Sequence, residues 1–319
     1  MLIDRYNRVI DNLRILVTGR CNLECFFCHR EGGSNGEGEL SAEDIEFVVR
    51  IATSLGIDKV KLTGGEPLIR DDIVDIIERI AGIKGVRDLS MATNGTLLAE
   101  KACELRKAGL RRINISLHSL NEETYKRITG RDLLHEVLEG LEAASKCGFD
   151  QVKVNVVLLR GINDGELDRL MEIAHEKGVV LQLIELESKR ADDPLFMNYH
   201  VSLEEIRKRL ESESIMIIRR SVQNRPIFRL KNGGIIELVA PVEDESFCLK
   251  CTKIRLTHDG VLKPCLFSDE GVNVLEYIRE RNVEALKRSF LRVVELKRPF
   301  FSEIWGVHDG GSKDGRYRG

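Results

Sequence analysis

The sequence predicts an α/β protein: a partial, open βα barrel of about six parallel strands with a smaller C-terminal α+β subdomain. Two observations lead to this prediction. Between residues 12 and 187, short β-branched or apolar segments alternate with longer amphipathic segments, which is typical of repeated βα units. After residue 188 the alternation stops, so we expect the barrel core over residues 1–188 and the subdomain over residues 189–319.

Each predicted strand is a short segment rich in β-branched or large apolar residues. The six are LRILVT (13–18), KVKLTG (59–64), DLSMAT (88–93), RINISL (112–117), QVKVNVVL (151–158) and LQLIEL (181–186). Ser41 with Asp44 has the pattern of a capping box, so a helix begins there and ends at Gly56. Another helix is expected from Asn163 or Asp164 to Gly178. Right-handed crossovers would wrap these units into an open barrel, short of the eight units of a complete one.

The C-terminal third has a different pattern. We expect a helix near residues 201–211, a hairpin in IFRLKNGGIIELVA with its turn at residues 232–234, and helical structure up to about residue 297. The last residues, DGGSKDGRYRG, are rich in glycine and charge and are expected to form a frayed tail.

Composition limits the classes of function. The 319 residues carry a formal net charge of -3, with 42% hydrophobic and 32% charged residues, which is ordinary for a globular protein and gives no overall attraction to nucleic acid or membrane. The N-terminus lacks a secretory apolar segment, and no apolar run reaches the roughly 20 residues of a membrane span. We therefore expect a cytoplasmic protein that binds any anionic ligand through a local basic cluster.

Eight cysteines are distributed unevenly along the chain. In the reducing cytoplasm, clustered thiols indicate metal ligands or catalytic groups rather than disulfides. Cys103 and Cys147 stand alone on predicted amphipathic helices, and we expect them to be small core residues. The other six form two groups of three.

The first group is Cys21, Cys25 and Cys28, in a CxxxCxxC spacing directly after the first predicted strand. This position is the mouth of an α/β barrel, where such folds keep their active sites. Three thiolates leave one iron of a four-iron cluster open, and that iron can take a further ligand. The alternative from residue types alone is a zinc site completed by His29.

The spacing, with Phe27 before the last cysteine, resembles the signature of the radical S-adenosylmethionine (SAM) superfamily. Thr63-Gly64-Gly65-Glu66-Pro67, at the end of the second strand, is similar to the superfamily's GGEP motif. The resemblance implies that the open iron binds SAM and that electron transfer from the cluster yields a 5'-deoxyadenosyl radical. It further implies SAM contacts by Phe27, Gly65, Ser116 and Glu187.

The second group is Cys248, Cys251 and Cys265. On spacing alone, a zinc ribbon completed by His258 is the alternative to a second iron–sulfur cluster. The segment CTKIRLTHDGVLKPCLF, from Cys251 to Phe267, resembles the GTP 3',8-cyclases of molybdenum-cofactor biosynthesis, and the resemblance covers about residues 12–267. In that family a second 4Fe-4S cluster binds the guanine of GTP and basic residues hold the triphosphate.

This resemblance implies an enzyme with two 4Fe-4S clusters that converts GTP to 3',8-cyclo-7,8-dihydro-GTP. The radical removes the hydrogen at ribose C3', and the ribose radical attacks C8 of guanine. The positions matching the family's GTP contacts are Arg14, Lys61, Ala92, Lys153, Lys253, Ile254 and Arg255. No side chain beyond the cluster ligands is assigned a catalytic role.

The chain departs from the family pattern in two places. Lys61 and Lys253 stand where the family commonly has Arg, and Lys exchanges a bidentate fork for a point charge. Bacterial members end in a Gly-Gly tail that reaches the active site, whereas here SKDGRYRG follows Gly310-Gly311. The sequence leaves open whether this tail inserts.

Two other functions are compatible with the sequence. One is a different radical SAM enzyme with an auxiliary cluster, such as a peptide-maturing or haem-modifying enzyme. The other is a non-catalytic zinc or electron-transfer protein, which leaves GGEP without a purpose. The expected partners are GTP and an electron-donor protein, without nucleic acid or membrane; the oligomeric state is open, with a homodimer as one arrangement.

Overall fold

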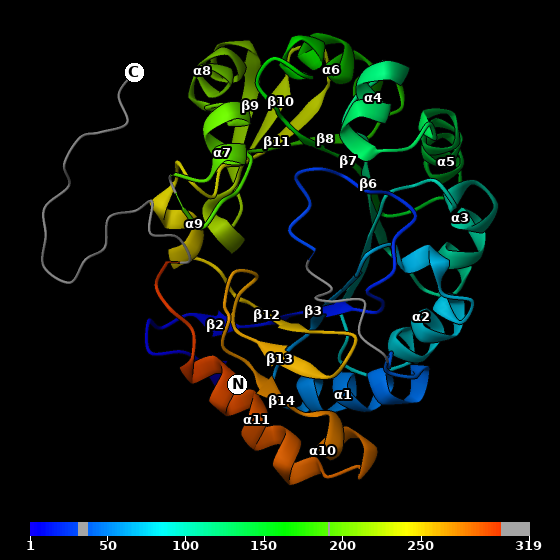
Figure 1. The fold of residues 1–319 in the computed structure, drawn as a ribbon, viewed down its shortest axis with the longest axis vertical. Helices are drawn as coiled ribbons and strands as arrows, with labels where there is room; N and C mark the ends of the chain where they lie inside the picture. Colours follow the sequence, from blue (N-terminus) through cyan, green and yellow to red (C-terminus); the bar gives the residue numbers. More distant parts are fainter. Residues whose placement is uncertain (31–37, 191, 301–319) are drawn as a thin grey trace, which may run out of the picture.

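In the computed structural model, which describes residues 1–30, 38–190 and 192–300, a curved sheet is surrounded by helices (Figure 1). The six predicted strands are confirmed, and all neighbouring pairs among them are parallel. They are β3 (Asn12–Leu16), β4 (Lys59–Thr63), β5 (Asp88–Thr93), β6 (Arg112–Ser116), β7 (Gln151–Val157) and β8 (Val180–Ile184).

Helices connect these strands and cover the outside of the sheet (Figure 1). They are α1 (Ala42–Ser54), α2 (Ile73–Ala81), α3 (Leu98–Lys107), α4 (Glu122–Thr129), α5 (Leu134–Lys146) and α6 (Leu167–Glu176), with short 3-10 turns η1 (Pro67–Ile69) and η2 (Asp164–Glu166). The predicted capping box of α1 is present: Ser41 Oγ accepts from Asp44 N at 3.1 Å, and Ser41 N donates to the Asp44 carboxylate. Gly56 follows the helix with φ of +98°, a backbone conformation that favours glycine.

The remaining elements belong to the C-terminal third, except for a small N-terminal pair of strands, β1 (Leu2–Ile3) and β2 (Val9–Ile10). The C-terminal helices are α7 (Pro194–Tyr199), α8 (Glu204–Glu213), α9 (Glu245–Leu249), α10 (Leu275–Arg279) and α11 (Val283–Glu295), with the 3-10 turn η3 (Val222–Asn224). The C-terminal strands are β9 (Ser214–Arg219), β10 (Pro226–Leu230), β11 (Ile235–Val239), β12 (Lys253–Leu256), β13 (Val261–Lys263) and β14 (Val272–Asn273).

The C-terminal strands extend the sheet at both ends, which the sequence did not predict. The order in the 12-stranded sheet is β14-β13-β12-β3-β4-β5-β6-β7-β8-β11-β10-β9. β11 pairs parallel with β8, and β12 pairs parallel with β3. A six-stranded open barrel exposes two edges with unpaired backbone groups, and these two strands satisfy them. The predicted hairpin is formed by β10 and β11.

The core lies between the sheet and the helices. Along β3 and β4, buried apolar residues alternate with half-buried polar ones, for example Leu13 and Ile15 against Arg14. The apolar side chains belong to the main hydrophobic core with residues of α1 and α2, such as Val48 and Ile76. The polar side chains are therefore left for the inner face of the barrel, where a site can form.

The expectation that Cys103 and Cys147 are unbonded core residues was wrong. They form a disulfide with their Cα atoms 4.9 Å apart, and Cys103 is exposed rather than buried. The physical reason is that α3 and α5 pack side by side, which brings a residue of α3 against the C-cap of α5. That proximity depends on the tertiary packing of two helices and is not visible in the spacing of the cysteines.

None of the described helices combines the length and the apolar character that a membrane-spanning helix needs. The C-terminal tail expected to be frayed, with its Gly310-Gly311 pair, lies outside the described residues.

Candidate active site

A cavity of about 700 Å³ lies within the curve of the sheet and is lined by both cysteine groups. Each of the six cysteines predicted as cluster ligands contributes to its wall: Cys21, Cys25, Cys28, Cys248, Cys251 and Cys265. All six are free thiols. Cys21 follows β3 closely, whereas the second group flanks β12, which pairs with β3. The pairing of β12 with β3 therefore brings two groups more than 200 residues apart in sequence to one cavity.

The loop after β4 packs directly against the chain that leads to Cys21. Gly65 N donates to Thr18 O at 2.9 Å, and Glu66 N donates to Arg20 O at 2.8 Å. A Cβ on Gly65 would stand 2.0 Å from the carbonyl oxygen of Arg20. The glycine of the GGEP motif is therefore required for the approach of the cysteine loop, beyond any role in the approach of a ligand.

Glu66 connects this loop to the end of β5. Its buried carboxylate accepts hydrogen bonds from Thr93 Oγ1 and Asn94 N, both at 2.6 Å, and from Leu68 N at 3.0 Å. Burial raises the pKa of Glu66 to about 7, although the three donors act in the opposite direction. Asn94 Nδ2 in turn lies 3.9 Å from Cys21 Sγ. The end of β5 thus supports the loop that carries Cys21 through Glu66.

The first cysteine group does not have the geometry of a zinc site. Four-coordinate zinc holds its ligands at about 2.0–2.3 Å, so the ligand atoms lie within about 4 Å of one another. Among the described residues, the group of three or more candidate ligands mutually within 4.8 Å is Glu185, His200 and Glu243, and it contains no cysteine. His29 packs edge to face on Phe267 at 5.0 Å instead. A four-iron cluster does not require its ligand atoms to lie this close, because each thiolate binds a different iron.

Burial and neighbouring thiols affect the protonation of this group. Burial, followed by repulsion from Cys28 and Cys21, raises the pKa of the Cys25 thiol to about 12. Burial likewise raises the pKa of Cys21. A cationic metal centre is the kind of partner that would favour three neighbouring thiolates, because it supplies the positive charge that they lack.

The four residues predicted to contact SAM all line the cavity: Phe27, Gly65, Ser116 and Glu187. Phe27 packs edge to face on His118, with ring centroids 5.0 Å apart. Burial lowers the pKa of His118 to about 4, and its Nδ1 accepts from Val157 N at 3.2 Å. His118 is therefore neutral at pH 7 and supports the Phe27 ring in a fixed orientation.

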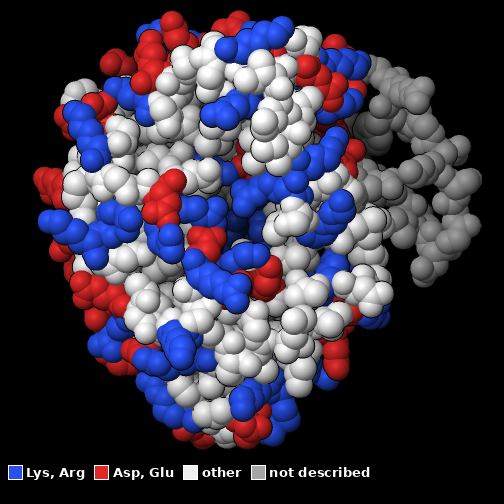
Figure 2. Space-filling view, turned by 180° about the vertical axis from the view of Figure 1, so that it is seen from behind, with Lys and Arg blue, Asp and Glu red and all other residues white. Residues whose placement is uncertain are grey.

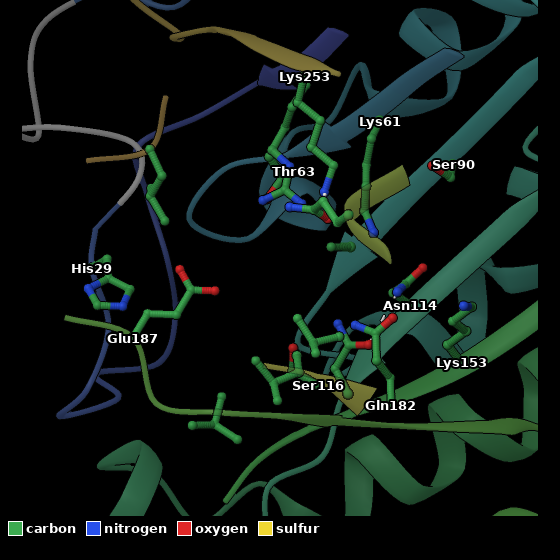
Figure 3. Close-up of a pocket in the computed structure, with 18 of the residues that line it drawn as sticks. His29, Lys61, Thr63, Ser90, Asn114, Ser116, Lys153, Gln182, Glu187 and Lys253 are labelled. Atoms are coloured by element: carbon green, nitrogen blue, oxygen red, sulfur yellow. Dashed lines mark hydrogen bonds between the residues drawn. The ribbon is translucent and has the colours of Figure 1, made fainter. Parts of the chain in front are cut away.

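Five basic residues predicted to contact GTP also line the cavity: Arg14, Lys61, Lys153, Lys253 and Arg255. The sheet register explains their convergence, since Arg255 on β12 lies opposite Arg14 on β3, which lies opposite Lys61 on β4. Figure 3 shows Lys61 and Lys253 entering from one side and Lys153 from another. Lys and Arg side chains also gather around a hollow on the face seen in Figure 2.

Of the other two residues predicted to contact GTP, only one has a side chain that lines the cavity. Ala92 lines the cavity. Ile254 does not: its side chain is fully buried in the main core, because alternation along β12 turns it away from the Lys253 and Arg255 side. Any contribution of Ile254 to the cavity is restricted to its backbone.

Like charges face one another across this basic cluster. Burial, followed by repulsion from Arg14, Lys253 and Lys153, lowers the pKa of Lys61 well below its ordinary value. The pKa of Lys253 is lowered in the same way, by burial and then by repulsion from Arg225 and Arg14. Lys61 has no ion pair among the described residues. Cations held together in this way favour binding of a polyanion.

Sequence reasoning missed four residues that complete the cluster. Glu237, on β11, is fully buried and pairs with Lys153, with Arg220 at 3.4 Å and with Arg225 at 3.2 Å. Burial opposes the charge of Glu237, but Arg225 and Lys153 outweigh it and lower its pKa to about 2. The fourth, Gln223, accepts from Lys253 Nζ through its side-chain oxygen at 2.6 Å.

One sequence signal could have found Glu237, because it is the single acidic residue in an otherwise apolar strand, IIELV. Arg225 and Gln223 had no such signal. They lie around the η3 turn, where Gln223 and Asn224 adopt φ of +61° and +50° in the left-handed region. Backbone of this kind in non-glycine residues is often found where a loop is held in place at a binding site.

The second cysteine group lies beside the basic cluster. Burial would raise the pKa of the Cys251 thiol, but Lys297 and Lys253 outweigh it and lower the pKa below its ordinary value. The expected alternative zinc ligand, His258, does not line the cavity. Its buried ring packs against Gly19 instead, so it cannot complete a zinc ribbon with the cysteines there.

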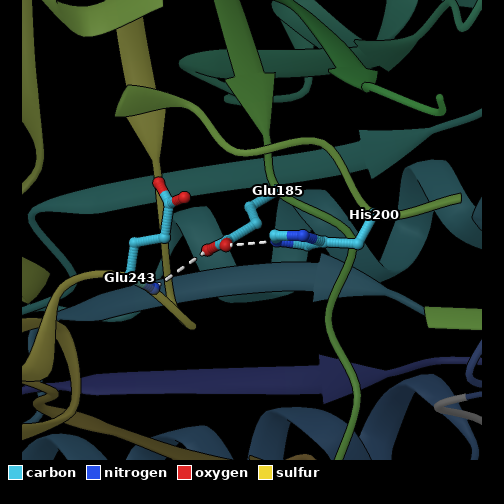
Figure 4. A group of neighbouring side chains, drawn as sticks. All are labelled: Glu185, His200 and Glu243. Carbon is cyan, nitrogen blue, oxygen red and sulfur yellow. Dashed lines mark hydrogen bonds and ion pairs between the residues drawn. The ribbon is translucent and has the colours of Figure 1, made fainter. Parts of the chain in front are cut away.

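Glu185, which also lines the cavity, forms a further group with His200 and Glu243 at the end of β8 (Figure 4). The carboxylate of Glu185 is already engaged: Oε1 lies 2.6 Å from His200 Nε2, and Oε2 accepts from Val242 N at 2.8 Å and from Glu243 N at 3.3 Å. The group therefore links β8 to α7 and to the loop after β11.

Comparison with known protein families gives two matches that together span most of the chain. The family model of the Radical SAM superfamily matches residues 15–174, and that of Molybdenum Cofactor Synthesis C matches residues 179–302. The chain is 43% identical to the "Probable GTP 3',8-cyclase" of Methanothermobacter thermautotrophicus, covering 94% of this chain and 98% of the relative. It is 44% identical to the protein of the same name from Pyrococcus abyssi, covering 95% and 100%.

Solved structures support the fold. Streptococcus suis SuiB bound to S-adenosylmethionine superposes with a TM-score of 0.66 at 16% identity, covering 89% of this chain and 68% of SuiB. Native anSMEcpe with bound AdoMet superposes with a TM-score of 0.59 at 18% identity, covering 88% and 83%. The partial barrel with a C-terminal extension is thus an arrangement known from other proteins.

Proposed function

Since the chain belongs to the radical SAM superfamily and, within it, to the GTP 3',8-cyclases, we propose that it converts GTP to 3',8-cyclo-7,8-dihydro-GTP. This is the first step of molybdenum-cofactor biosynthesis. The observation that carries the proposal is the single cavity that joins two groups of three cysteines to a cluster of basic side chains. Three thiolates in each group leave one iron of a four-iron cluster open, so each cluster can bind a ligand inside that cavity.

The first cysteine group and its surroundings would hold one cluster and SAM. Cys21, Cys25 and Cys28 would bind three irons, and Phe27 and Gly65 would contact SAM beside them. Ser116 and Glu187 line the same cavity from the ends of β6 and β8. When bound, the cluster and SAM supply the radical that removes the hydrogen at C3' of GTP. The chain's own contribution is to fix the distance between SAM and the ribose and to exclude water.

The second group and the basic cluster would hold GTP. Cys248, Cys251 and Cys265 would bind the second cluster, which would supply an open iron for the guanine. Five cations would bind the triphosphate: Arg14, Lys61, Lys153, Lys253 and Arg255. The low pKa values of Lys61 and Lys253 support this, because a polyanion relieves the repulsion that lowers them. Ala92 would contact GTP through its small side chain, and Ile254 through its backbone.

Residues outside the matched motif pattern extend the triphosphate site. Glu237 holds Lys153 and Arg225 from behind the cavity wall, so the two cations keep their geometry when no phosphate is bound. Lys61 and Lys253 stand where the family commonly has Arg, and the arginines at positions 220 and 225 add guanidinium groups to the same cavity. These arginines would restore the forked hydrogen bonding that lysine lacks.

Several further expectations belong to the same proposal. The division into a barrel core over residues 1–188 and a cluster-bearing subdomain over residues 189–319 is one of them. An electron-donor protein that reduces the first cluster, a cytoplasmic location and a homodimer are the others. The Gly310-Gly311 tail lies outside the described part of the chain, and its insertion into the cavity is not part of the proposal.

Replacement of Cys265 by Ala tests the proposal. The variant should keep the first cluster, with about four irons per chain rather than about eight. It should still cleave SAM slowly to 5'-deoxyadenosine but form no cyclised product from GTP. The matched control, Cys21→Ala, should lose SAM cleavage altogether. If Cys265→Ala retains cyclisation, the second group has a structural role and the assignment of GTP to it is wrong.

A further inference from the structure

Lys297 is a buried lysine behind the wall of the cavity, directly after Leu296 at the C-cap of α11. The residue is only 4% exposed, yet it does not line the cavity. The helix that precedes it, α11, packs against β13 and β14 (Figure 1). Lysine is almost never buried to this extent without a partner, so the surroundings of its ammonium group indicate its role.

The ammonium group of Lys297 holds two of the segments that carry the second cysteine group. Its Nζ donates to the backbone oxygen of Lys253 at 2.7 Å and to that of Pro264 at 3.1 Å. Lys253 comes two residues after Cys251, and Pro264 directly precedes Cys265. A single buried cation therefore connects the chain on either side of β12 and β13 at the point where these cysteines meet.

The two hydrogen bonds satisfy donors of Lys297 but leave its charge without a counter-ion. Among the described residues, Lys297 has no carboxylate partner. The anionic groups that it does affect are thiols: burial would raise the pKa of Cys251, but Lys297, ahead of Lys253, outweighs burial and lowers it. Burial raises the pKa of Cys265, and Arg255 and, less strongly, Lys297 oppose that rise. A buried charge is costly unless it is paired, so the second cysteine group is where its partner belongs.

A second buried cation near the same cysteines, Arg8, shows the contrast. Its Nη1 donates to the backbone oxygen of Cys248 at 2.7 Å, and its Nη2 donates to that of Arg298 at 2.8 Å. Its Nε, however, pairs with the buried carboxylate of Asp4 at 2.6 Å. The charge of Arg8 is thus compensated within the protein, and Arg8 can hold Cys248 by hydrogen bonding alone. Lys297 lacks such a carboxylate among the described residues.

We propose that Lys297 is the buried counter-ion of the second cluster and favours the reduced state of that cluster. The inference rests on the proposed function in one respect, that the second cysteine group binds a four-iron cluster. Three thiolates give such a cluster a net negative charge, which an added electron increases, so a nearby buried cation stabilises the reduced state more than the oxidised one. Lys253 and Arg255 line the cavity, where phosphate groups would neutralise them, whereas Lys297 lies outside the lining and keeps its charge for the cluster.

A redox titration of the second cluster, followed by electron paramagnetic resonance, tests the proposal. The parent is the full chain with Cys21→Ala, reconstituted anaerobically, so that the second cluster is observed by itself. Lys297→Gln keeps an amide donor for the two carbonyls but removes the charge, and it should lower the equilibrium constant for reduction at least about tenfold, a shift of about 59 mV to more negative potential. Lys297→Arg keeps the charge and should titrate close to the parent. The matched control is Lys250→Gln, which removes an exposed, solvent-screened charge directly beside Cys251 and should leave the potential unchanged.

Iron content separates failure of this inference from failure of the proposed function. A Cys21→Ala chain that binds no iron has no second cluster, and both are then wrong. If that chain binds about four irons but Lys297→Gln titrates like the parent, or shifts no more than Lys250→Gln, the inference alone is overturned. A cluster lost in Lys297→Gln and kept in Lys297→Arg would support the role of the charge. A cluster lost in both variants would mean that Lys297 acts through its geometry, which also overturns the inference.

Discussion

The close approach of Gly65 to the cysteine loop makes Gly65→Ala an informative perturbation. A Cβ at this position would stand 2.0 Å from the carbonyl oxygen and 2.5 Å from the carbonyl carbon of Arg20, and 3.0 Å from the backbone nitrogen of Cys21. Ordinary contact needs more than 3 Å, so the two backbones must separate by about 1 Å or more. Both hydrogen bonds between the loops lie at this point, and overpacking of this kind costs about 1–3 kcal/mol. Most of the displacement should fall on the loop that carries Cys21.

The expected result is a folded protein that loses its first cluster. Iron and sulfide analysis after anaerobic reconstitution should give about four irons per chain instead of about eight. SAM cleavage should be lost, while GTP still binds in equilibrium dialysis. Gly165→Ala is the matched control, because a Cβ there meets nothing within 4 Å, and it should behave as wild type. A Gly65→Ala variant with both clusters and wild-type SAM cleavage would refute the argument.

Three other predictions concern charges and the disulfide. Replacing Lys61 by Met removes a cation from a repulsive cluster, so urea unfolding should find the nucleotide-free protein more stable by about 1 kcal/mol, with GTP affinity at least about tenfold weaker. Glu237→Gln leaves Lys153 buried without its counter-ion and should cost about 3–5 kcal/mol at pH 7. Because the pKa of Glu237 is lowered from 4.5 to about 2, its charged form stabilises the fold above pH 4.5. The gap between wild type and Glu237→Gln should therefore shrink as the pH falls from 4.5 toward 2, and a pH-independent gap would contradict the ion pair. Replacing both Cys103 and Cys147 by Ser opens a loop of 44 residues and should lower the unfolding free energy by up to about 4 kcal/mol without affecting cyclisation; an unchanged free energy would mean that no disulfide forms.

Much of the fold and of the candidate site could be predicted from local sequence patterns. The cysteine spacings and the glycine loop are short-range patterns, so they picked out six cysteines and a loop that the structure brings to one cavity. The strands of the barrel were also readable, because β-branched segments and helix caps are local signals.

What could not be predicted depends on pairing between distant segments. Glu237 reaches Lys153 because β11 joins β8 in parallel, and the hairpin pattern of β10 and β11 gave no indication of that edge. The Cys103–Cys147 disulfide depends on the packing of α3 against α5. Exposure of Ile217 likewise follows from the position of β9 at the end of the sheet, whereas its sequence resembles a buried strand.

The most direct test of the central claim follows the hydrogen that the proposed reaction moves. GTP carrying deuterium at C3' is incubated anaerobically with the reconstituted protein, SAM and a reductant, and the products are analysed by mass spectrometry. We expect one deuterium in 5'-deoxyadenosine and a cyclised purine product formed in step with it. Formation of 5'-deoxyadenosine that is indifferent to GTP, or that contains no deuterium, would contradict it.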